Sequence, residues 1–194
     1  MTTGRRRSVV VAAAAFAAGW LAGGPAWGAT AWSVDPGASR IGFTATLAGG
    51  EFDGRFGDFT ADIAFDPADA REQSFRVVIR TGSAATGDAS RDEALVGPDF
   101  FSTTRWPDAT YVADRFSAAG PGRWVAHGRL TLRGVSRDED VEFTFKPGPG
   151  DTAVLAGGTT VRRLDFGVGQ GDWRDTSVLG NDVRISFSLL LHRK

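Results

Sequence analysis

Cysteine is missing from this chain of 194 residues, and histidine occurs only twice, as His127 and His192. Without cysteine the protein has no disulfide bond, no thiolate nucleophile and no thiolate metal ligand. Neither histidine has a second histidine or an acidic residue at metal-site spacing, and no serine lies in a G-x-S-x-G sequence. The sequence therefore predicts neither catalytic residues nor a metal centre.

An excess of either charge is also missing, since 22 lysines and arginines stand against 23 aspartates and glutamates. The first 29 residues hold three arginines and no acid, so the rest of the chain carries 19 − 23, or −4. A mildly acidic protein with scattered charges has no basic surface for nucleic acid or for an anionic membrane. We therefore expect no nucleic-acid partner.

The longest apolar run lies near the N-terminus and is short for a membrane span. Arg5, Arg6 and Arg7 precede an alanine-rich apolar segment of about 15 residues, and small residues follow it, whereas a membrane-spanning helix needs roughly 20 residues. This layout is typical of a secretory signal peptide. We expect residues 1–29 to be removed on export, through the general secretory or the twin-arginine route; the alternative is an uncleaved anchor.

Alternation of apolar and polar residues is the dominant pattern in the rest of the chain. From Trp124 to Leu132 every second residue is apolar or small, Gly134 interrupts the run, and Val141, Phe143 and Phe145 resume it. A period of two places one apolar face along a β-strand. The segment predicts an antiparallel hairpin whose turn region includes Gly134 and the polar residues 136–140.

Similar runs recur from residue 41 to residue 189 with turn residues between them. They predict an all-β, antiparallel domain of about eight strands over residues 30–194, either a closed barrel or a sandwich. The apolar parity switches near Gly57, which predicts a β-bulge or bend there. The glycine-rich stretch from Gly167 to Gly171 lacks the lysine of a phosphate-binding loop and is interpreted as a turn at the rim.

One segment favours a helix instead. Asp88 to Val96 contains helix-forming residues with acids near its start, and Gly97-Pro98 ends it. These acids either stabilise the start of the helix or, together with Asp99, bind calcium, although they lack the spacing of an EF-hand. Phe100 and Phe101 follow directly, and we expect one ring to anchor the helix together with Leu95 and the other to face a pocket entrance.

Aromatic and aliphatic residues lie on the alternating face of nearly every predicted strand. They form an ordinary core, or they line a lumen, since eight strands that close around side chains can hold one small ligand. An apolar lumen selects an apolar ligand. The residues that we expect to line it are Phe43, Phe56, Phe59, Ile63, Val77, Ile79, Leu95, Phe100, Phe101, Tyr111, Leu130, Leu132, Phe143, Phe145, Phe166, Ile185 and Phe187.

Several stretches together resemble the YceI-like family of bacterial polyisoprenoid-binding proteins. They are W-S-V-D-P-G-A-S-R-I-G-F from Trp32, F-D-G-R-F-G-D-F-T-A-D-I-A-F-D-P from Phe52, R-D-E-A-L from Arg91, D-F-F-S-T-T-R-W-P-D-A-T-Y from Asp99, G-R-L-T-L-R-G-V-S-R-D from Gly128 and L-G-N-D-V-R-I-S-F from Leu179. They cover residues 32–191 in the order and spacing of the family.

The resemblance implies an extended lipocalin-like barrel with one short helix on a connection. It implies a periplasmic, non-enzymatic binder or carrier of a long isoprenoid lipid, namely a polyprenol, a polyprenyl phosphate or a quinone, with no other cofactor. Many members have a histidine in the helix where this chain has Ala94. Some relatives occur with cytochrome-type inner-membrane proteins, which makes such a protein a candidate partner; the oligomeric state stays open.

Two other functions fit the sequence. A stress-response or structural protein would have a fully packed barrel and no cavity. An enzyme acting in the lumen would need a buried, paired polar cluster, and His127, Arg162 and Asp165 are the residues that could form one.

Overall fold

The structure is a computed structural model, which describes residue 1, residues 29–69 and residues 71–194. The expected signal peptide therefore lies almost wholly outside the described residues. Among the described residues, no helix has both the length and the apolar composition needed to cross a membrane.

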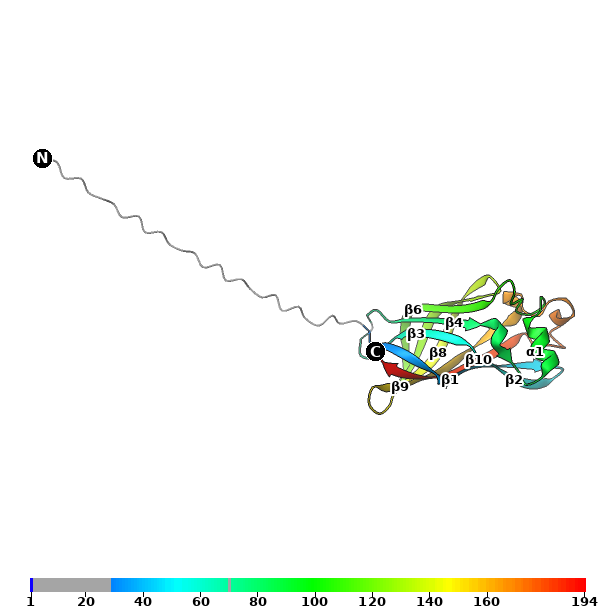
Figure 1. Ribbon diagram of the computed structural model, residues 1–194, viewed down its shortest axis with the longest axis horizontal. Coiled ribbons are helices and arrows are strands. Elements are labelled where there is room, and N and C mark those ends of the chain that lie inside the picture. Colours follow the sequence, from blue (N-terminus) through cyan, green and yellow to red (C-terminus); the bar gives the residue numbers. More distant parts are fainter. Residues whose placement is uncertain (2–28, 70) are drawn as a thin grey trace.

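Eight antiparallel strands close into a barrel (Figure 1). Around the barrel they are β1 (Ala31–Leu47), β3 (Phe59–Ala64), β4 (Ser74–Arg80), β6 (Asp108–Gly120), β7 (Arg123–Leu132), β8 (Val135–Pro147), β9 (Thr152–Arg162) and β10 (Asp182–Arg193). The pairing of β10 with β1 completes the ring. The predicted antiparallel barrel of about eight strands is confirmed.

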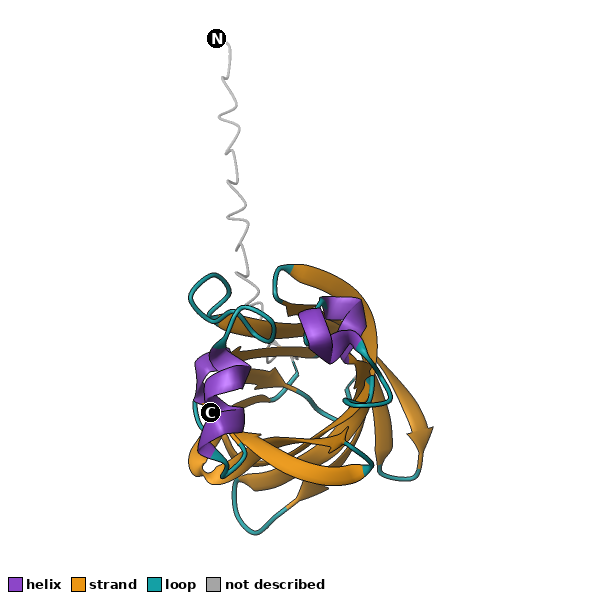
Figure 2. Ribbon diagram, turned by 90° about the vertical axis from the view of Figure 1, so that its right-hand side faces the viewer, coloured by secondary structure: helices purple, strands orange, loops and turns teal. Residues whose placement is uncertain are grey.

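Two further strands and the helical segments lie at one end of the barrel. β2 (Gly50–Phe56) pairs with β1, and β5 (Ala84–Ala85) pairs with β2. The α-helix is α1 (Ala89–Val96), and the 3₁₀-helices are η1 (Thr81–Ser83), η2 (Arg163–Phe166) and η3 (Gly171–Arg174). Figure 2 looks onto this end and shows helical turns at the rim of the barrel. We call residues 86–107 and 163–181 the cap.

The predicted irregularity near Gly57 is present. β2 ends at Phe56 and β3 begins at Phe59, and the register of the pairing with β1 differs on the two sides of this break. β1 has a matching irregularity between Asp35 and Arg40 in its pairing with β10. Because both strands change parity at the same level, the inward face stays apolar along the whole barrel.

The predicted hairpin forms from β7 and β8, but its turn is shorter than expected. Arg133 and Gly134 alone connect the strands, with φ angles of 51° and 73°. Positive φ at both central residues is the requirement of a two-residue type I′ turn. Residues 136–140 are therefore strand residues, and the prediction that they form the turn region is wrong. Their polarity reflects an exposed edge of the barrel wall.

The end of the barrel opposite the cap is filled by aromatic rings. The ring of Phe65 is fully buried, and its centroid lies 5.1 Å from that of Phe143, 5.3 Å from that of Phe145 and 5.3 Å from that of Trp124. Phe75 and Phe116 join the same group, with centroids 4.8 Å apart. We call these six residues the filled end. Their edge-to-face and tilted contacts are the favoured aromatic geometries.

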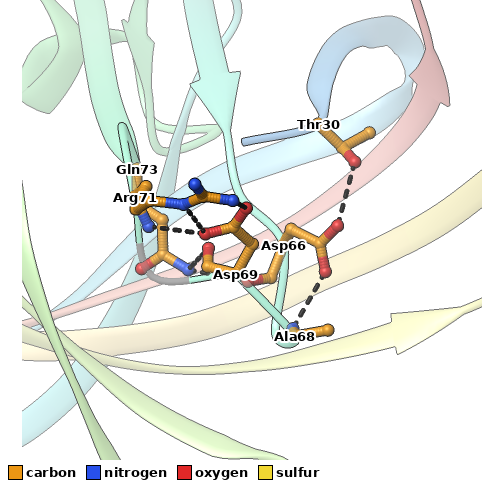
Figure 3. Close-up of polar contacts among 6 residues, drawn as sticks. All are labelled: Thr30, Asp66, Ala68, Asp69, Arg71 and Gln73. Atoms are coloured by element: carbon orange, nitrogen blue, oxygen red, sulfur yellow. Dashed lines mark hydrogen bonds and ion pairs between the residues drawn. The ribbon is translucent and has the colours of Figure 1, made fainter. Parts of the chain in front are cut away.

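Hydrogen bonds fix the connection between β3 and β4 at the filled end (Figure 3). The buried Gln73 side chain donates to the carbonyl oxygens of Asp66 and Asp69, at 2.7 and 3.0 Å. The carboxylate of Asp66 accepts from the Thr30 hydroxyl at 3.2 Å. Arg71 donates twice to Asp69 and holds the pKa of that carboxyl at about 2. The start of β1 is thereby tied to the same end of the barrel.

Candidate functional site

A cavity of about 210 Å³ lies inside the barrel between the filled end and the cap. Almost all of its lining residues are aliphatic or aromatic. Apolar cavities of about 150 Å³ stay dry in proteins and take up small apolar molecules. The lumen is therefore a site for apolar groups.

The lining contains all but four of the residues that the sequence predicted. Those that line it are Phe43, Phe56, Ile63, Val77, Ile79, Leu95, Phe100, Phe101, Tyr111, Leu130, Leu132, Ile185 and Phe187. Phe143 and Phe145 instead pack at the filled end, and Phe59 is buried in the same hydrophobic cluster. Phe166 is buried in the hydrophobic cluster of the cap. Alternation gives the face of a strand that a residue occupies and not its height in the barrel, so it could not exclude Phe59, Phe143 and Phe145. Phe166 lies in η2 and not on a strand.

Some lining residues were missed. Ile41, Phe75, Val141, Leu155 and Leu189 lie on the apolar parity of their strands and line the cavity, so alternation could have found them. The polar lining residues are Thr81, Glu139, Thr159 and Arg163. Glu139 and Thr159 share the parity of the buried Val141 and Val161, but a search for apolar residues passes over them.

Two aromatic rings of the lining lie against glycines on neighbouring strands. A Cβ on Gly54 would lie 2.1 Å from the Phe43 ring, and one on Gly128 would lie 2.5 Å from the Tyr111 ring. Any larger residue would displace these rings into the lumen. The glycines thereby keep the cavity open at these two places.

Phe100 and Phe101 both line the cavity, and both are 8% exposed. The Phe100 ring packs against Trp173, with centroids 5.5 Å apart, and the Phe101 ring packs against Phe56, with centroids 6.1 Å apart. Leu95 belongs to the same buried cluster. The expected division into one anchor and one entrance residue is therefore not what the structure shows, because both rings are buried in the same cluster and both line the cavity.

A buried arginine holds the cap together. Arg163 is 4% exposed, and its five N–H groups all donate to backbone carbonyl oxygens at 2.6 to 3.2 Å. The acceptors belong to Val168, Gly169, Trp173, Leu179 and Gly180. Burial lowers the pKa of Arg163, yet a guanidinium stays charged in proteins. The cation thus joins η2, η3 and the start of β10 into one unit.

Comparison with known proteins decides the family. The model of the YceI-like domain family matches residues 32–191, which is most of the chain. The chain belongs to the YceI-like family.

Relatives of this YceI-like domain include proteins of known sequence and solved structures. A UPF0312 protein of Shewanella oneidensis is 32% identical over 120 residues, which cover 59% of this chain and 63% of that protein. The crystal structure of BcnA from Burkholderia cenocepacia has 30% identity and a TM-score of 0.78, and the match covers 81% of this chain and 98% of that one. A YceI protein of Campylobacter jejuni has 26% identity and a TM-score of 0.65, over 73% and 84% of the two chains.

Few polar groups reach the lumen of this YceI-like domain, and most of them have partners. The Tyr111 hydroxyl donates to the carbonyl oxygens of Ala126 and Glu139, at 2.9 and 3.1 Å. Thr81 donates to the carbonyl oxygens of Trp106 and Pro107, both at 3.0 Å. The Glu139 carboxylate is the exception, since no hydrogen bond or ion pair reaches it from the described residues. Burial raises its pKa, and the nearby carboxylates of Asp140 and Asp165 raise it further.

The candidate enzyme residues do not form one cluster. His127 lies on the outer face of β7, where Nδ1 is 2.8 Å from the Asp140 carboxylate and Nε2 is 2.9 Å from the Ser117 hydroxyl. Arg162 and Asp165 instead pair with each other at 3.9 Å. The hydrogen bonds link a serine, a histidine and an aspartate, as in the triad of a serine protease. The Ser117 and His127 side chains, however, line neither the lumen nor the groove outside it.

The acids near α1 serve the helix. Asp88 accepts from the backbone N–H of Arg91 at 2.9 Å and so caps the first turn. Asp92 accepts from the backbone N–H and the hydroxyl of Thr86, both at 2.7 Å. Across the described residues, no group of three or more histidine, cysteine, aspartate or glutamate side chains is arranged to hold a metal ion.

Proposed function

We propose that this YceI-like domain binds a long-chain isoprenoid lipid, namely a polyprenol, a polyprenyl phosphate or a quinone, in the lumen of its barrel. The observation that carries the proposal is the apolar cavity between the filled end and the cap. Binding needs only apolar walls and no catalytic group. The protein acts in transport or storage of the lipid and not as an enzyme.

The energetics favour a chain of linked apolar units. Each CH₂ group that leaves water for an apolar site contributes about 0.8 kcal/mol. A few isoprene units therefore supply micromolar binding, which needs about 8 kcal/mol. A cavity of about 210 Å³ holds a segment of such a chain, so a longer lipid moves the lining rings apart or extends beyond the lumen.

A neighbour in fold supports the choice of lipid. The structure of a domain from Saccharophagus degradans, described as polyisoprenoid-binding, matches with a TM-score of 0.68 over 85% of this chain and 99% of that one. Its sequence identity of 17% carries the fold only. The choice of an isoprenoid ligand for this protein therefore rests on the resemblance of its sequence to the YceI-like family and on the apolar lining of its lumen.

The cellular setting belongs to the same proposal. The arginines and the apolar run at the N-terminus support export and a periplasmic location. A periplasmic carrier exchanges its lipid with a membrane partner, for which a cytochrome-type inner-membrane protein is the candidate. The chain matches about 63% of the length of the first curated relatives. The periplasmic location and the membrane partner are therefore argued from the N-terminal sequence and the ligand class and not from these relatives.

A structural protein with a packed barrel is the less suitable alternative. That function predicts side chains that fill the lumen from end to end. Here the rings fill one end only, and the cavity occupies the rest. Lipid binding accounts for this division, and a purely structural role does not.

Two adjacent valines on β4 provide a test. Val77 lines the cavity, whereas Val78 points outward on the same strand. We expect Val77→Trp to fill the lumen and to weaken binding of geranylgeraniol at least about tenfold, because the indole occupies the space of two isoprene units. Val78→Trp should bind it like the unchanged protein.

Binding is measured by native mass spectrometry after delipidation, and circular dichroism checks that both variants fold. Equal uptake of geranylgeraniol by the two variants, or none by the unchanged protein, would contradict the proposed function.

A further inference from the structure

Two neighbouring strands of the barrel wall stay paired over only about half of their length. β8 and β9 pair from Pro147 and Ala153 up to Glu142 and Gly158. Beyond that point β8 continues to pair with β7, and β9 continues to pair with β10, but in the described part of the chain they do not pair with each other. We call residues 135–141 of β8 and residues 159–162 of β9 the seam.

Two glycines mark the place where the strands part. A Cβ on Gly157 would lie 2.1 Å from the carbonyl oxygen of Glu142, and one on Gly158 would lie 2.2 Å from that of Ile185. Backbones approach this closely only where no side chain intervenes. β9 therefore passes tightly between its neighbours at the glycines and leaves β8 directly after them.

The lumen and a groove on the outer surface share wall residues beside the seam. Gly158, Thr159 and Ile185 line both the lumen and a groove on the outer surface of β8, β9 and β10. A ligand in the lumen therefore lies beside polar residues here, with Glu139 and Thr159 in the lining. The polar end of an amphipathic lipid belongs at such a boundary, because its hydrogen-bonding groups cannot be satisfied among the apolar rings.

Glu139 is the charged residue of the seam that lines the lumen. It lies two residues before the buried Val141 on the same face of β8, and it lines the lumen. Its carboxylate has no partner among the described side chains, and Asp140 and Asp165 lie close enough to act on it. The charge that a ligand meets at the seam is therefore negative.

The arginine that lines the lumen has no free N–H group to offer to Glu139 or to a ligand. Arg163 also lines the lumen, but backbone carbonyls occupy all five of its N–H groups. Arg162 is engaged with Asp165. Neither Arg162 nor Arg137 of the seam lines the lumen, so a phosphate on the lumen side of the seam would meet the Glu139 carboxylate and no free arginine donor among the residues that the structure describes.

We infer that the head group of the lipid lies at the seam and that Glu139 selects an uncharged, hydrogen-bond-donating head group, such as an alcohol or a quinol, over a phosphate. The carboxylate accepts a hydrogen bond from a hydroxyl and repels a phosphate. This inference rests on the proposed function and narrows its ligand class.

The test compares two probes that share one tail, geranylgeraniol and geranylgeranyl monophosphate, at pH 8. We expect the full protein to bind the alcohol at least about tenfold more tightly than the phosphate, because like charges meet at the seam. Glu139→Gln should tighten binding of the phosphate by about tenfold and leave binding of the alcohol within about twofold. Dissociation constants are measured by titration calorimetry.

Asp138→Asn is the matched control, because Asp138 lies next to Glu139 but points outward and pairs with Arg129 at 2.8 Å. It removes the same net charge and should leave the preference unchanged. A preference for phosphate, or a preference that Glu139→Gln does not alter, would overturn the inference while lipid binding stands. Failure of both probes to bind would overturn the proposed function and the inference with it.

Discussion

At the scale of single residues, Arg163 shows how one side chain can organise a region that lacks regular structure. Its guanidinium replaces the hydrogen bonds that a strand or helix would give to the carbonyls of residues 168–180. Gly169 is required beside it, since a Cβ there would lie 2.2 Å from the arginine Nη1. The cap over the cavity therefore depends on one buried cation.

Removing this cation should loosen the cap. We expect Arg163→Met to lower the free energy of unfolding by about 3 kcal/mol or more, because buried carbonyl groups that lose a partner cost about 1–3 kcal/mol each. The adjacent Arg162→Met should cost no more than about 1 kcal/mol, since Arg162 is exposed and its ion pair is a surface pair. Urea denaturation of the two variants measures both values, and equal midpoints would show that Arg163 does not stabilise the cap.

At the scale of elements, strands β8 and β9 are neighbours in the barrel that do not stay paired. They pair over one half of their length and part at Gly157 and Gly158. The alternation of β8 and the weaker alternation of β9 each predicted a strand. Nothing in either pattern shows that the partners separate, because pairing depends on the path of the backbone and not on which face is apolar.

The missing cysteines make the seam directly testable, because two introduced cysteines can pair only with each other. Asp140 and Thr160 would be partners if the β8–β9 register continued, whereas Thr144 and Ala156 are partners in the structure. A disulfide needs Cα atoms about 4.4–6.8 Å apart. We expect Thr144→Cys with Ala156→Cys to oxidise in air and Asp140→Cys with Thr160→Cys to stay reduced.

Thiol titration before and after unfolding reports both pairs. Oxidation of the two pairs at the same rate would mean that β8 and β9 form a continuous ladder, and the seam would not exist as a boundary of the lumen.

The elements also show which parts of the site a sequence can predict. The apolar walls could be predicted, since alternation alone identifies Val77, Leu130 and Ile185, which line the cavity. The filled end was not distinguished from the cavity, because Phe143 and Phe145 have the same parity as the lining residues of their strand. Their height in the barrel is set by packing against Phe65 and its neighbours, which come together only when the barrel closes.

At the scale of the whole molecule, the barrel has two unlike halves. Figure 1 shows the start of β1 and the C-terminus at the end of the barrel opposite α1. Aromatic rings fill that end, and the cavity lies between them and the cap. The filled end gives the protein a stable core without disulfides. The other half is free to hold a ligand, because the stability of the barrel does not require that its space be filled.

The central claim is that the lumen holds a long isoprenoid lipid. The most direct measurement is native mass spectrometry of the protein purified from its own host, followed by extraction and mass identification of the released molecule. The account predicts a single apolar adduct with an isoprenoid tail and an uncharged head group, absent after delipidation and restored by the extracted lipid. A protein that is consistently empty and takes up neither polyprenols nor quinones would contradict it.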